Sequence, residues 1–224
     1  MAQEIADGQK QSEVERLVEL YDLQPHPEGG WFKETFRSTA HCQNEHLHGN
    51  KDSRVATVCY YLLPKNGMSH WHRLASDEIW LYHDGGCLKV CDNGYLTSGW
   101  EVKAVEGFAF QTHYKATLAL TDPYGLKKAI GLPEHLPIHM IDEKGVYSSA
   151  VLGSSLEHPE ARYGVSVPAE VWLAAEPTNG GNFSLISCLV APGFEWKGFE
   201  MGREEDLVTS FPHLADIIKP YCQP

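Results

Sequence analysis

Two histidines one residue apart, followed by a glutamate, occur in the stretch Ser69–Trp80, SHWHRLASDEIW. Alternate side chains of a β-strand point to the same side, so His70 and His72 are expected to converge if this stretch is a strand. Two imidazoles together with the carboxylate of Glu78 form a ligand set that suits Fe(II), Mn(II) or Zn(II). The first hypothesis is therefore a metal site made of His70, His72 and Glu78.

The same residues also suit acid/base chemistry, because an imidazole beside a carboxylate in an apolar pocket has a tuned proton affinity. His72 and Glu78 would then abstract a proton next to a carbonyl group. A second proton donor would come from a tyrosine, and we include Tyr60 in the predicted catalytic set, with Tyr61 and Tyr82 as alternatives. A structural interpretation stays open as well, in which His72 bonds a backbone carbonyl and His70 lies at the surface.

Other side chains are candidates for ligand contacts. Glu28, in PHPEGGWF, can hydrogen-bond a ligand hydroxyl, whereas the prolines and glycines around it favour a rigid connector. Arg37 can hold a carboxylate or phosphate, or pair with Glu34 or Asp77. Two tryptophans offer aromatic walls, although core packing is the competing interpretation. The predicted ligand-binding set is Glu28, Arg37, His70, Trp80 and Trp172.

The elements that must position these residues are mostly strands. Four stretches, 54–64, 77–86, 163–175 and 182–196, combine β-branched or aromatic residues with glycine or proline boundaries. The last is apolar on both faces, as expected of a strand inside a sandwich. Short strands between two helical ends predict an all-β sandwich or jelly roll.

Both ends of the chain show helical patterns. Ser12 and Glu15 form a predicted capping box, and apolar residues then recur at helical spacing up to Tyr21. Near the other end, Leu214, Ile217, Ile218 and Tyr221 would share one helical face. We therefore expect an N-terminal helix within 1–22 and a helical tail over 203–224.

Composition narrows the classes of partner. The 224 residues carry a net charge of −12, which disfavours binding to nucleic acids and to anionic membranes. No apolar run is long enough for a transmembrane helix, and the N-terminal stretch lacks the apolar core of a signal peptide. The six cysteines form no CxxC pair. We expect a cytoplasmic protein with reduced thiols and a small-molecule ligand.

Five ordered motifs and the tail resemble the cupin-5 family of the cupin superfamily. They are LQPHPEGGWFKETFRS (23–38), YYLLPKNGMSHWHRLASDEIW (60–80), AVLGSSLE (150–157), VPAEVWLAA (167–175), CLVAPGFEWKGFE (188–200) and REEDLVTSFPHLADII (203–218). The resemblance implies a double-stranded β-helix, or jelly-roll barrel, over 23–202, commonly paired as a homodimer. It also implies structural kinship with sugar-nucleotide epimerases. Compared with the family pattern, about 50 additional residues intervene at about 86–135, and we expect this insertion to be folded.

The cupin pattern bears on the metal hypothesis. His70, His72, Glu78 and Gly85 fit the ends of the first cupin motif, but the fourth ligand of the second motif would fall at Leu173, which cannot ligate. Three functions therefore stay open: an isomerase, epimerase or cyclase that requires no cofactor; a cupin with a single divalent metal (Fe, Mn, Ni or Zn), such as a dioxygenase or a metal-assisted isomerase; and a non-catalytic ligand-binding module.

Overall fold

A computed structural model describes residues 11–49, 51–86, 89–90, 137–177 and 181–223, which all belong to one structural unit. Its strands are β1 Gln24–Pro25, β2 Trp31–Arg37, β3 His41–Gln43, β4 Asp52–Arg54, β5 Thr57–Pro64, β6 Ser69–Leu74, β7 Asp77–Gly85, β8 Lys89–Val90, β9 Pro137–Ile141, β10 Tyr147–Leu152, β11 Ala161–Arg162, β12 Gly164–Val167, β13 Trp172–Ala175, β14 Phe183–Ala191 and β15 Phe199–Met201. Its helices are α1 Glu13–Leu20, α3 Glu204–Ser210 and α4 Ala215–Ile218, with short 3₁₀ turns at Trp196–Gly198, Pro212–Leu214 and Lys219–Tyr221.

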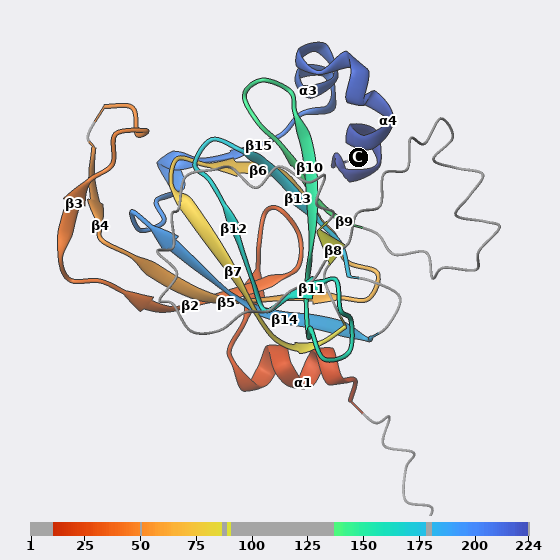
Figure 1. The fold of residues 1–224 in the computed structure, drawn as a ribbon. Helices are drawn as coiled ribbons and strands as arrows, with labels where there is room; N and C mark the ends of the chain where they lie inside the picture. Colours follow the sequence, from red (N-terminus) through yellow and green to blue (C-terminus); the bar gives the residue numbers. More distant parts are fainter. Residues whose placement is uncertain (1–10, 50, 87–88, 91–136, 178–180, 224) are drawn as a thin grey trace, which may run out of the picture. The chain divides into compact units, whose positions relative to one another are not determined.

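The strands form two sheets and a separate β3–β4 hairpin (Figure 1). One sheet has the order β1-β2-β5-β14-β7-β12. The other has the order β11-β10-β9-β13-β6-β15, and β8 joins it at β9. Residues from both sheets meet in one buried cluster, which includes Tyr61, Trp80 and Ile186 from the first sheet and Leu152 and Leu173 from the second. This is the predicted all-β sandwich of the jelly-roll class.

The two ends of the chain cover the outer faces of the two sheets. Helix α1 begins with the predicted capping box: Ser12 Oγ accepts from the Glu15 amide at 3.2 Å, and the Glu15 carboxylate accepts from the Ser12 amide at 2.8 Å. Its apolar side packs on Leu62 and Leu185 of the first sheet. The C-terminal segment packs on Trp71 and Trp172 of the second. Strands with helices on one side and a core on the other are apolar on both faces, as the sequence indicated.

Most of the predicted insertion at about 86–135 lies outside the described residues. The four cysteines within the described part, Cys42, Cys59, Cys188 and Cys222, are free thiols. In the same part of the chain, no helix has the length and apolar character needed to cross a membrane.

Candidate functional site

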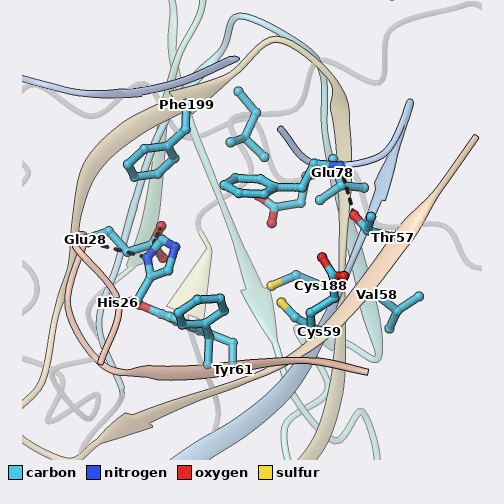
Figure 2. A pocket seen from close by; sticks show the side chains of 14 residues that line it. His26, Glu28, Thr57, Val58, Cys59, Tyr61, Glu78, Cys188 and Phe199 are labelled. Atoms are coloured by element: carbon cyan, nitrogen blue, oxygen red, sulfur yellow. Dashed lines mark hydrogen bonds and ion pairs between the residues drawn. The ribbon is translucent and has the colours of Figure 1, made fainter. Parts of the chain in front are cut away.

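A small cavity opens between the two sheets. It offers about 60 Å³ to the centres of water molecules. Because one water needs roughly 10–15 Å³ on this measure, the space suits several waters or a small organic group. Figure 2 shows His26 and Glu28 on one side and Cys59, Cys188 and Glu78 across from them.

The wall on the first sheet is built from cross-strand rows. Cys59 of β5 lies opposite both Glu34 of β2 and Cys188 of β14. In the neighbouring row, Val190 of β14 lies opposite Glu78 of β7. Directly opposed residues of antiparallel strands point to the same face, so each row presents its side chains to the cavity together. The facing wall comprises His26, Glu28, Leu74, Phe194 and Phe199.

A tight turn positions Glu28. The amide of Gly29 donates to the carbonyl of His26 at 3.0 Å, and the His26 amide donates to the Gly30 carbonyl at 3.1 Å. Gly29 has a φ of +112°, and a Cβ there would lie 2.0 Å from the carbonyl oxygen of Met68. Only glycine satisfies both conditions. The connector is therefore rigid, and its rigidity points the Glu28 carboxylate inward.

Glu28 is the centre of a buried polar cluster. It is 5% exposed, and its Oε1 accepts from Ser69 Oγ at 2.9 Å. Its Oε2 lies 3.2 Å from Nδ1 of His26 and 3.3 Å from Nε2 of His72. Burial raises the pKa of Glu28, but the charge of His72, the hydrogen bond and charge of His26 and the Ser69 hydroxyl outweigh it and lower the pKa to about 2.

His72 contacts the Glu28 carboxylate from outside the cavity lining. The ring is 2% exposed and does not line the cavity. Its Nδ1 donates to the carbonyl oxygen of His70 at 2.8 Å, while Nε2 faces the Glu28 carboxylate. His72 therefore helps to position the Glu28 carboxylate, and its bond to a backbone carbonyl matches the structural interpretation.

His26, which the predicted sets omitted, lines the cavity. Its Nδ1 lies 3.4 Å from the backbone N–H of Glu28 and 3.2 Å from the Glu28 carboxylate. A neutral Nδ1 accepts from the amide, whereas a protonated Nδ1 donates to the carboxylate. The ring thus has a partner with or without this proton, which suits a group that exchanges it. The sequence signal was its place two residues before Glu28 in PHPEGG.

Glu78 occupies the opposite wall. It is 7% exposed, and its Oε2 has no hydrogen-bond partner among the described residues. Burial and, less strongly, the negative charge of Glu28 raise the pKa of Glu78, against the opposing influence of His72, Trp80 and Cys188. Glu78 is therefore easier to protonate than an ordinary glutamate, whereas Glu28 is harder to protonate.

The structure separates His70 from His72. Leu173 of β13 pairs with His72, but Ala175 pairs with Ser69, so β6 has one more residue than β13 over this interval. This β-bulge breaks the alternation on which the prediction depended. Ser69 and His72 point to Glu28, whereas Nδ1 of His70 lies 3.2 Å from the carbonyl oxygen of Tyr221 in the C-terminal segment.

The predicted metal ligands consequently do not fit one ion. His70 faces the C-terminal segment, and both ring nitrogens of His72 already have partners. No group of three or more His, Cys, Asp or Glu side chains within the described ranges is arranged to hold a metal ion. Leu173 lies opposite His72 and is buried in the core, where the fourth cupin ligand was expected.

The remaining predicted residues lie outside the cavity. Trp80 is 1% exposed in the core between the sheets. Trp172 packs under the C-terminal segment, with the Arg73 guanidinium 4.7 Å from its ring centroid. Arg37 pairs with Glu34 at 2.7 Å and Glu195 at 3.3 Å, one of the alternatives foreseen for it.

Tyr60 points away from the cavity, and its neighbour Tyr61 lines it. The Tyr60 ring packs 4.9 Å from that of Tyr21, beside α1. The Tyr61 hydroxyl donates to the Gly29 carbonyl at 2.8 Å, and burial raises its pKa well above 10. Adjacent strand residues face opposite sides, so the tyrosine inside the barrel is Tyr61 rather than Tyr60.

This difference predicts unequal effects of one substitution at two neighbouring positions. Tyr61→Phe leaves the buried Gly29 carbonyl without its donor, and we expect the free energy of unfolding to fall by about 1–2 kcal/mol. Tyr60→Phe, the matched control, should change it by less than about 0.5 kcal/mol. Chemical denaturation of both variants measures the difference. A larger loss for Tyr60→Phe would contradict the assigned orientation of β5.

A double-sheet jelly roll with a polar cavity between its sheets defines a cupin-type barrel. The family model described as Cupin_5, Cupin superfamily (DUF985), matches residues 15–110 and 132–202, and the chain belongs to this family. Between its two matched parts the family model leaves out residues 111–131, which fall within the predicted insertion. Comparison with curated proteins gives no match.

Solved structures share the fold. A hypothetical protein from Leishmania major is 24% identical, with a TM-score of 0.66, over 95% of this chain and 100% of that one. A protein from Shewanella oneidensis is 22% identical, with a TM-score of 0.65, over 96% and 99%. A dTDP sugar isomerase from Desulfovibrio desulfuricans is 11% identical, with a TM-score of 0.40, over 85% and 91%. The first two similarities show the fold alone, so the function must be inferred from the cavity itself.

Proposed function

We propose that the protein binds a small organic molecule in the cavity and transfers a proton to or from it, in the manner of an isomerase, epimerase or cyclase. The observation that carries the proposal is the unequal set of contacts of two buried carboxyl groups that line one cavity. Glu28 contacts Ser69, His26 and His72, whereas Oε2 of Glu78 has no hydrogen-bond partner among the described residues. The pKa of Glu28 is lowered to about 2, and that of Glu78 is raised. Environments that move two such pKa values apart assign one group to charge and the other to proton transfer.

The contacts give each residue a role. Glu78, whose side chain lines the cavity, exchanges a proton with the ligand. His26 lines the facing wall and provides the second exchanging group. Glu28 stays ionised and orients His26. Ser69 and His72 are positioning residues, because they contact the Glu28 carboxylate and do not line the cavity.

Solvent deuterium tests the proposal. Purified protein is incubated in deuterated buffer with pools of small organic molecules, and bound and free compounds are analysed by mass spectrometry. An enzyme that moves a proton at carbon introduces deuterium into its substrate. Since general acid/base groups contribute typically 10²–10⁴-fold, Glu78→Gln should slow this exchange by about 100-fold or more.

The matched control is Glu200→Gln, which removes an exposed carboxylate paired with Arg73 at 2.7 Å and should leave the exchange rate unchanged. Circular dichroism verifies that both variants are folded. Exchange that persists in Glu78→Gln would refute the role of this residue. Compounds that bind wild-type protein but return without deuterium would establish the non-catalytic binding module instead.

A further inference from the structure

The geometry points to a ligand class for this cavity: a small organic cation, such as a primary to quaternary ammonium compound. The inference rests on the proposed function, because it concerns the same cavity. It follows from the charges that line the cavity, from the one carboxylate in the lining that has no cation of its own among the described residues and from the aromatic rings around it. Each of these features is independent of how the ligand reacts.

The cavity lining is acidic. Its carboxylates are Glu28, Glu34 and Glu78, and among the described residues no lysine or arginine lines it. Arg37 donates to both oxygens of Glu34 at 2.7 and 2.8 Å and to the carbonyl of Phe194 at 3.2 Å. Its guanidinium is thus used within the protein. Within the described part of the chain, a phosphate or carboxylate ligand would therefore meet mainly negative charge, because the His26 ring in the lining already contacts the Glu28 carboxylate.

Glu78 differs from the other two carboxylates in its lack of a cation of its own. Glu34 pairs with Arg37, and Glu28 has His26 and His72 within 3.3 Å of Oε2. The charge of His72 also acts on Glu78, but Nε2 of that ring faces Glu28. A buried carboxylate without a compensating charge is costly, and a cation in the cavity would remove this cost.

Aromatic rings complete the environment. Phe32, Phe194 and Phe199 line the cavity, and the Phe194 and Phe199 ring centroids are 6.1 Å apart. A ring face attracts a cation within about 6 Å, most strongly where water is excluded. Rings together with carboxylates are the composition that proteins use to recognise ammonium groups. A positive charge also acidifies C–H bonds close to it, so the same ligand class suits proton transfer by Glu78.

Simple ions test the inference without knowledge of the natural ligand. Calorimetric titrations use choline, tetramethylammonium, the uncharged choline analogue dimethylbutanol and inorganic phosphate, with sodium chloride as the salt control. We expect choline to bind about tenfold or more tightly than dimethylbutanol, since a desolvated cation–π contact is worth about 2 kcal/mol and each 1.4 kcal/mol is tenfold. Phosphate should show no binding.

The pH dependence identifies the carboxylate. Choline favours ionised Glu78, so its affinity should increase as pH rises through the pKa of this group, and binding should release a proton. The charged and titratable groups that act on Glu78 are His72, Glu28 and Cys188, from β6, the loop before β2 and β14. In Glu78→Gln the increase should vanish and choline affinity should fall about tenfold. Phe199→Leu should weaken choline binding and spare dimethylbutanol.

Two outcomes would overturn the inference: dimethylbutanol or phosphate binding as tightly as choline, or choline affinity unchanged in both Glu78→Gln and Phe199→Leu. Glu200→Gln, with an exposed carboxylate removed, is the matched control and should bind choline as wild-type protein does. Deuterium exchange separates this result from the proposed function. Choline binding without any exchange refutes proton transfer alone, whereas exchange into uncharged or anionic compounds refutes the ligand class alone.

Discussion

Replacing Glu28 with glutamine is expected to lower the free energy of unfolding by about 3 kcal/mol at neutral pH, because it removes the buried carboxylate whose contacts with His72, His26 and Ser69 lower its pKa to about 2. The melting temperature should then fall by roughly 6–12 °C. Urea denaturation and thermal unfolding measure these changes. Glu200→Gln, which removes the carboxylate of an exposed ion pair with Arg73, should cost less than about 1 kcal/mol.

The stability difference between wild-type protein and Glu28→Gln should depend on pH. The pKa of Glu28 is about 2 in the folded protein and 4.5 ordinarily, so the unfolded chain binds the proton first. The stabilisation is therefore complete above about pH 4.5 and disappears as the pH falls towards about 2. A difference that stays constant over this range, or one below about 1 kcal/mol at neutral pH, would contradict the ion-pair assignment.

Trp80→Ala is the second substitution expected to have a large effect, a loss of about 3–5 kcal/mol, because it empties a buried ring from the core. Trp80 is 1% exposed, and its ring lies 5.8 Å from that of Tyr61. Its indole N–H has no hydrogen-bond partner within the described residues. Trp80→Phe, which keeps a six-membered ring in the core and loses only part of the buried volume, should cost only about 1 kcal/mol.

The matched control is Trp196→Ala. Trp196 is 54% exposed and stacks on His26 with ring centroids 5.6 Å apart, so its loss should cost less than about 1 kcal/mol. Denaturation of the three variants tests the core assignment of Trp80. If Trp80→Ala left the stability unchanged and abolished choline binding, Trp80 would be a cavity-lining residue, as the sequence analysis predicted.

Much of the architecture could be predicted from local signals. Apolar alternation, glycine and proline boundaries and the helical patterns at both ends indicated a sandwich between two helices, and the ordered motifs indicated the family. The capping box of Ser12 and Glu15 was likewise correct. These features depend on near neighbours in the sequence, so their physical causes can be recognised without coordinates.

The candidate site was less predictable from the sequence, because it depends on which side chains of each strand face the cavity. Tyr60 and Tyr61 are both largely apolar neighbours in a strand covered on both sides, so hydrophobicity did not tell which one faces the cavity. Trp80 raised the same difficulty. Its side chain points between the sheets, but only the packing of both sheets shows that it belongs to the core and not to the cavity lining. Glu28 was predicted as a ligand contact from its motif, but its contact with His26 depends on the turn at Gly29 and Gly30, which is a three-dimensional feature.

The bulge in β6 also limits what an HxH pattern can mean. Inserting one residue into β13 between Leu173 and Ala175 would match the two strands and restore alternation, so that His70 could share the inward side of His72. The distinction between a split pair and a convergent pair of histidines is therefore one step of strand register, with no change in the identity of either histidine. In evolutionary terms, a single-codon insertion in β13 would be enough to exchange a split pair of histidines for a convergent pair.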